Sequence, residues 1–169
     1  TYIVDFRKLL NFFIIPIDLN ILAGILVHKG VLRMATVDIN YWAVLVSALI
    51  AFGIGAVWYS LLFGKKWMEL MNINPARINK EEMKKKATKG YIIMFIALLL
   101  MAYILSHFVD YTGANSIVEG MTAGFWIWLG FLATTMVGSF LWEDKPFTLY
   151  LINVGHYLVV LLVMGAILA

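Results

Sequence analysis

The sequence predicts an all-α protein, a transmembrane four-helix bundle with an additional marginal N-terminal apolar helix. Hydrophobic residues make up 63% of the 169-residue chain and charged residues only 14%, whereas soluble domains average roughly 45–50% and about 25%. Four uncharged apolar runs, 39–63, 91–109, 120–142 and 147–169, are each close to or above the roughly 20 residues that a helix needs to cross a bilayer. The runs are continuous and lack the alternation of barrel strands, so helices are favoured.

Residues 1–33 form an N-terminal apolar extension of lower quality. Asn11, Pro16, Asp18 and Asn20 interrupt its apolar run, and an Asp near a helix centre costs roughly 2.5–3.5 kcal/mol on insertion scales. We predict a fifth span, a re-entrant piece or an interfacial helix, preceding a four-span membrane domain over 34–169. Met34 offers an alternative natural start for that domain.

The loop over 64–90 carries eight of the thirteen basic residues. The positive-inside rule therefore predicts that this loop is cytoplasmic, that 110–119, without Lys or Arg, lies outside, and that the C-terminus is also outside. Aromatic residues near span ends, among them Trp58, Tyr59 and Trp142, are typical of membrane interfaces.

The second half of this loop is expected to be a helical extension of the second span, because Asn79 and Glu82 have the spacing of a capping box. Its lysines favour a solvated anchor or, more sharply, a surface at Lys84, Lys85 and Lys86 that docks anionic lipid or an acidic partner. A basic charge confined to one loop beside the membrane argues against a nucleic-acid partner.

Polar residues inside the spans are the default place to look for function. In the fourth span, Asn153, His156 and Tyr157 share one side of a helix, and Thr134 and Thr135 of the third span are predicted at a similar depth. Such a cluster could relay protons or coordinate a small polar ligand. Alternatively, these groups hydrogen-bond one helix to another.

Small residues predict close helix packing. Gly120 and Gly124 form a GxxxG motif, and Ala51 with Gly55 is a small-xxx-small pair; such faces let helix backbones approach closely. Packing inside the bundle is favoured over dimerisation.

No catalytic, cofactor or metal site is predicted. The sequence has no cysteine and no GxSxG, HExxH or Walker motif. His107, Asp110 and Glu119 lie at the adjoining ends of the second and third spans, but carboxylates at a helix boundary are ordinarily solvated, and no close ligand motif accompanies them.

Several segments resemble one known family. They read N-Y-W-A-V-L-V at 40–46, W-Y-S-L-L-F-G-K-K-W at 58–67, G-F-L-A-T-T at 130–135 and Y-L-I-N-V-G-H-Y at 150–157. These resemble the bacterial and archaeal membrane proteins catalogued as domain of unknown function 1761, over 34–169. The chain departs from the family at Leu61, where a proline is expected, and at His156-Tyr157, where Tyr-His is expected. That swap turns the imidazole by about 100° around the helix.

The resemblance implies a four-helix protein of the cytoplasmic (inner) membrane of a prokaryote, and it supplies no established activity. We therefore expect a non-enzymatic, multi-pass protein of the lipid bilayer that acts as a homo-oligomer or as a small subunit of a larger membrane assembly. The alternative is a small-solute or proton-coupled transporter that uses the Asn/His/Thr cluster.

Overall fold

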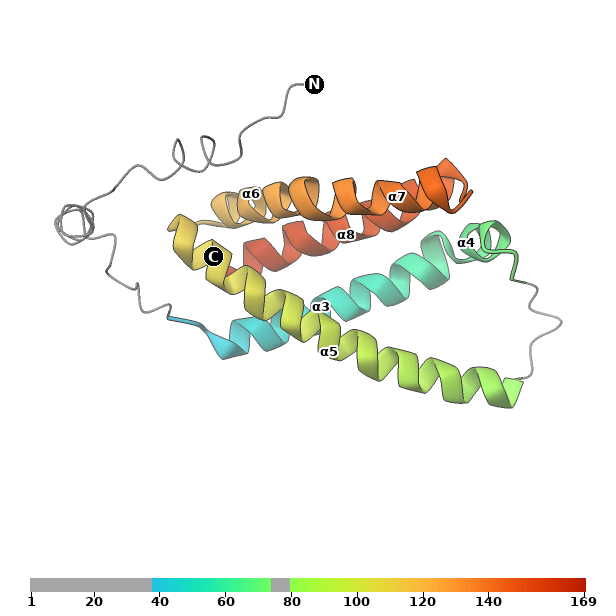
Figure 1. Ribbon diagram of the computed structural model, residues 1–169. Coiled ribbons are helices and arrows are strands. Elements are labelled where there is room, and N and C mark those ends of the chain that lie inside the picture. The colour runs from blue at the N-terminus through green and yellow to red at the C-terminus, as the bar shows by residue number, and fades with distance from the viewer. Residues whose placement is uncertain (1–37, 74–79) are drawn as a thin grey trace, which may run out of the picture. The chain divides into compact units, whose positions relative to one another are not determined.

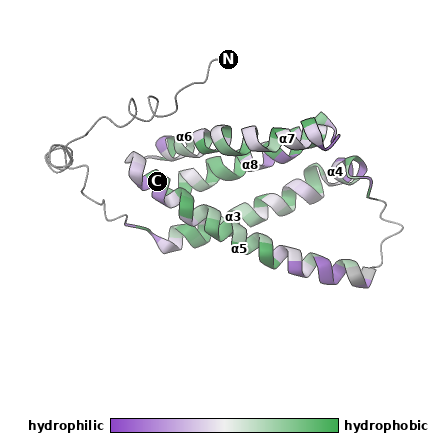
Figure 2. Ribbon diagram, in the orientation of Figure 1, coloured by the Kyte–Doolittle hydropathy of each residue, from purple (hydrophilic) through white to green (hydrophobic). Residues whose placement is uncertain are grey.

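A computed structural model describes residues 38–73 and 80–169 (Figure 1). Within these ranges the chain contains helices and no strands, which confirms the all-α prediction. Four helices are long and apolar enough to cross a membrane: Tyr41–Leu62, Met83–Thr112, Ile117–Trp142 and Phe147–Leu168. Figure 2 shows hydrophobic residues along all four. These correspond to the four predicted spans and indicate a multi-pass membrane protein. The predictions for 1–33 and for the Asn79–Glu82 capping box lie outside the described residues and side chains.

The first span combines two kinds of helix. Helix α3 (Tyr41–Val57) begins at Asn40, whose side-chain oxygen accepts hydrogen bonds from the backbone N–H groups of Trp42 and Ala43 at 3.1 Å. This N-cap satisfies donors that the first turn leaves unpaired. The span ends in a π-helical segment, η1 (Trp58–Leu62), followed by the short helix α4 (Gly64–Leu70).

Helix α5 (Lys80–Thr112) runs 33 residues without interruption. It contains the whole second span and the lysine-rich sequence before it, so the second half of the charged loop is a helical extension, as predicted. The chain leaves this helix through Gly113, whose φ of +66° is a left-handed conformation suited to glycine.

The third span is interrupted near its middle. It consists of α6 (Ile117–Ile127), the π-helical segment η3 (Trp128–Ala133) and α7 (Thr134–Trp142). The fourth span is a single helix, α8 (Phe147–Leu168), which begins directly after Pro146. Proline is suited to a helix start because N–H groups in the first turn have no acceptor within the helix, so the N–H that proline lacks costs no hydrogen bond.

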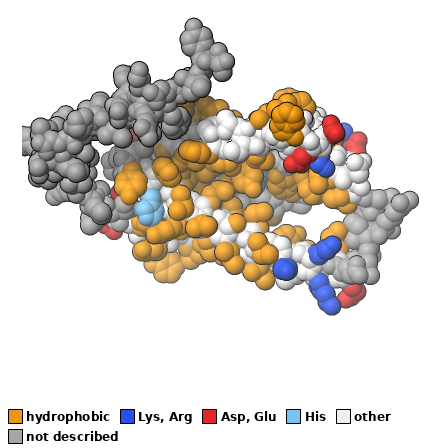
Figure 3. Space-filling model, in the orientation of Figure 1, with side chains coloured by type: hydrophobic (Ala, Val, Ile, Leu, Met, Phe, Trp, Pro, Cys, Tyr) orange, Lys and Arg blue, Asp and Glu red, His pale blue; other side chains and the backbone are white. Residues whose placement is uncertain are grey.

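Helix α8 is the centre of the packing. In its most apolar window 39% of residues are buried, compared with 6% in the third span. It contacts α3, α5, α6 and α7. The core joins apolar side chains of three helices: Val44, Ala48 and Ala51 of α3, Leu98, Ala102, Leu105 and Val109 of α5, and Val160, Leu161 and Met164 of α8. On the face shown in Figure 3, hydrophobic side chains cover the middle and charged ones gather toward the ends.

Candidate functional site

The polar residues predicted on α8 lie at the contact between α8 and the end of the first span. His156 is only 7% exposed. Its ring contacts those of Trp58, Tyr59 and Tyr157, with centroid separations of 6.0, 5.0 and 5.1 Å. Aromatic rings from the first span and from α8 therefore surround the imidazole.

Asn153 is held by a hydrogen bond between helices. The Tyr59 hydroxyl donates to the Asn153 side-chain oxygen at 3.0 Å. The imidazole of His156 lacks such a bond, since neither of its ring nitrogens has a hydrogen-bond partner among the described residues. Gly55 leaves room for it: a Cβ at this position would lie 3.3 Å from His156 Nε2. The predicted small residue in the first span thus accommodates a buried imidazole.

Two tryptophans hold the same turn of α8. The indole N–H of Trp58 donates to the Ile152 carbonyl at 3.1 Å, and that of Trp128 donates to the Val154 carbonyl at 2.8 Å. Two residues that are two positions apart on an α-helix lie about 200° apart around its axis. The two tryptophans therefore contact α8 from opposite sides. Each is the first residue of a π-helical segment. We call the segment from Ile152 to His156 with its aromatic partners the aromatic clamp.

Thr134 and Thr135 were predicted at a depth similar to that of the polar residues of α8, and the structure shows what their hydroxyls contact. Both are exposed, and their hydroxyls bond to their own helix: Thr134 to the Gly130 carbonyl, Thr135 to those of Phe131 and Leu132. The next carbonyl, of Ala133, accepts the Tyr150 hydroxyl at 3.0 Å. Side-chain hydroxyls therefore donate hydrogen bonds to four consecutive backbone carbonyls of the widened η3 turn. In a membrane, this replaces the hydrogen bonds that water would supply.

The two glycines of the GxxxG motif face α8. A Cβ on Gly120 would overlap the Gly165 carbonyl, and one on Gly124 would overlap that of Leu161. Both glycines are buried. We call this contact the glycine interface; it packs helices within one chain.

The residues considered as cation ligands at the adjoining ends of the second and third spans make local contacts. His107 Nδ1 lies 2.9 Å from the Tyr103 carbonyl, and a Glu119 oxygen accepts from the Asn115 N–H at 2.8 Å. The Glu119 N–H in turn donates to the Ser116 hydroxyl, which caps α6. Within 38–73 and 80–169, no three His, Cys, Asp or Glu residues are grouped as a metal site requires.

The polar side of α8 was predicted from helical spacing. Trp58 and Tyr59 were predicted at the membrane interface, and their contacts with α8 were not predicted. The available signal was that Trp58 and Trp128 each follow an uninterrupted apolar helix segment inside a span, where an indole N–H needs an acceptor.

Comparison with known proteins identifies one family. The family described as "Protein of unknown function (DUF1761)" matches residues 42–169, which is most of the chain and, apart from Tyr41, all four described spans. No curated protein and no solved structure matches the chain significantly.

Proposed function

The chain belongs to the DUF1761 family, and we propose that it is a non-enzymatic membrane subunit that functions as a homo-oligomer. In this proposal a second copy packs against the outward face of α6, η3 and α7. The main support for this proposal is the low burial of the third span, since only 6% of its most apolar window is buried within the chain.

The outward face of the third span has the composition of a helix–helix contact. Gly130, Thr134 and Gly138 follow one another at intervals of four, and the Thr134–Gly130 hydrogen bond of 2.7 Å is consistent with one shared side. No neighbouring side chain lies within 4 Å of a Cβ placed on Gly130. Small residues allow close approach between membrane helices, and the glycines that pack inside the chain are different ones.

The sealed aromatic clamp favours a structural role over transport. A solute or proton pathway would need the polar residues of α8 to meet water. His156 is instead buried among aromatic rings, and the Asn153 oxygen is occupied by Tyr59. This arrangement supports the proposal that the polar groups hold helices together.

The proposed orientation follows from charge. In the proposed orientation loop 64–90 lies in the cytoplasm and the C-terminus outside. The cytoplasmic (inner) membrane of a prokaryote is what the family resemblance implies. Single cysteines introduced at Lys66 and at Asn115 test this sidedness in intact cells, because a membrane-impermeant maleimide should label only the Asn115 site. The reverse labelling pattern would overturn the orientation.

The oligomer is tested by counting subunits. Gly130→Leu and Gly138→Leu place bulk on the outward face, and the full-length variants should shift toward monomers in single-molecule photobleaching of liposomes. Gly53→Leu is the matched control, because a Cβ on Gly53 also has no neighbour within 4 Å but lies on α3. A monomeric wild type would refute the oligomer, and unchanged oligomers of the Gly130 and Gly138 variants would refute this face.

A further inference from the structure

One face of α5 carries a groove of about 570 Å³ at the start of the second span. The described residues that line it all belong to α5: Glu81, Lys84, Lys85, Thr88, Lys89, Ile92 and Ile93. Their spacing alternates steps of three and one, which places them on a single side of a helix. We call this the lysine–isoleucine face.

The polar and apolar parts of the face are ordered along the helix. Three lysines precede the two isoleucines, which lie about one turn further into the span. Beyond them, exposed Ile96 and Leu100 continue the same side at intervals of four residues. The face thus passes from cationic to apolar over a few turns, as the headgroup and acyl regions of a bilayer do.

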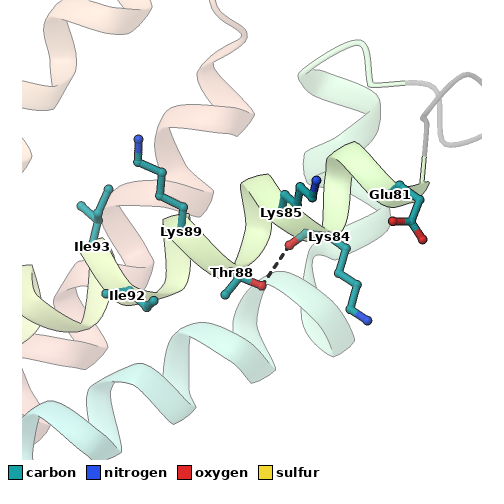
Figure 4. A pocket seen from close by; sticks show the side chains of 7 residues that line it. All are labelled: Glu81, Lys84, Lys85, Thr88, Lys89, Ile92 and Ile93. Carbon is teal, nitrogen blue, oxygen red and sulfur yellow. Dashed lines mark hydrogen bonds between the residues drawn. The ribbon is translucent and has the colours of Figure 1, made fainter.

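The charges of the face favour an anion. Its lining has three lysines and one carboxylate, Glu81. Figure 4 shows the ammonium groups of Lys85 and Lys89 on one side of the helix axis and that of Lys84 on the other. The Thr88 hydroxyl donates to the Lys84 carbonyl at 3.0 Å, so its proton is already used within the helix. The lysine ammonium groups are therefore the donors available to an anionic group.

We propose that the lysine–isoleucine face of α5 binds one anionic phospholipid. The phosphate lies beside the ammonium groups of Lys85 and Lys89, which share one side of the helix axis, and an acyl chain follows Ile92, Ile93 and Ile96. The occupant is a lipid, because the cations continue directly into an exposed apolar track within a membrane span. Lys86 is exposed but does not line the groove. Of the three consecutive lysines, only Lys84 and Lys85 therefore belong to the lysine–isoleucine face.

Native mass spectrometry of the full-length protein in mild detergent tests this site. Phosphatidylglycerol is titrated against the wild type and the Lys85→Gln/Lys89→Gln variant, with phosphatidylcholine as the neutral lipid. Since each lysine near an anionic surface contributes about fivefold to affinity, the double variant should bind phosphatidylglycerol about 25-fold more weakly. Phosphatidylcholine should bind both proteins weakly and equally.

The matched control is Lys65→Gln/Lys86→Gln, which removes the same charge outside the face and should retain wild-type affinity. An equal loss in this control would mean diffuse attraction and would overturn the site. Equal binding of the two lipids would also overturn it. Competition by inorganic phosphate at the concentration of phosphatidylglycerol would identify a free-phosphate site and refute the lipid. All these lysines are exposed, so thermal unfolding should be unchanged in both variants.

Discussion

Helix α8 is held by two interfaces of opposite design. At the glycine interface, Gly120 and Gly124 of α6 have no side chains, so the α6 backbone lies directly against Gly165 and Leu161 of α8. At the aromatic clamp, Trp58, Tyr59 and Trp128 insert large side chains whose polar ends bond to α8. Close backbone contact leaves no space to adjust, whereas an aromatic side chain can shift. The two interfaces should therefore differ in their tolerance to substitution.

The largest effect is expected at the glycine interface. Gly124→Ala would place a methyl group against the Leu161 carbonyl, and such overpacking costs about 1–3 kcal/mol. The free energy of unfolding in detergent should fall by this amount. Gly53→Ala is the control, because its Cβ meets open space. Equal stabilities of the two variants would contradict the rigid contact.

A smaller loss is expected for Trp58→Phe. The change removes the indole N–H that bonds to the Ile152 carbonyl, while much of the ring packing remains. Hydrogen bonds between membrane helices contribute about 0.6 kcal/mol on average and 1–2 kcal/mol in model peptides. Thermal unfolding should detect a loss in this range. Trp142→Phe, at a side chain that is 85% exposed, should leave stability unchanged.

Tyr59→Phe isolates a single hydrogen bond of the clamp. Removing the hydroxyl that donates to Asn153 should cost about 0.6 kcal/mol. A double-mutant cycle with Asn153→Ala measures the pair directly. A coupling energy of zero would show that the two side chains act independently and would weaken the clamp as a polar contact.

The smallest effect is expected for His156→Leu. No hydrogen bond to a described residue is lost, and an apolar side chain of similar size fills the space beside Gly55, so the free energy of unfolding should remain the same or rise. If stability instead fell as far as in Gly124→Ala, the imidazole would have a polar partner beyond these residues. That result would favour the transport alternative.

The four spans could be predicted because length and apolarity decide membrane insertion residue by residue. The shared side of Asn153 and His156 was also accessible, since both lie on the regular helix α8. The direction of the Thr134 and Thr135 side chains was not accessible, because depth counted from a span end does not give the side of the helix. The π-helical segment η3, which lies between these residues and α6, also interrupts the regular α-helical spacing. The positions of Trp58 and Trp128 inside spans indicate that each indole N–H needs an acceptor. The two π-helical segments that bring them to α8 have no local sequence pattern, so the acceptors themselves could not be predicted.

The contacts of α8 also differ in how much of the chain they close. Helices α7 and α8 are separated by only residues 143–146, so the glycine interface joins the two arms of a hairpin. The Trp58–Ile152 bond links residues 94 positions apart. Because closing a longer loop costs more entropy, the contacts within this hairpin, including the Trp128–Val154 bond, close at a lower entropic cost than the Trp58–Ile152 bond.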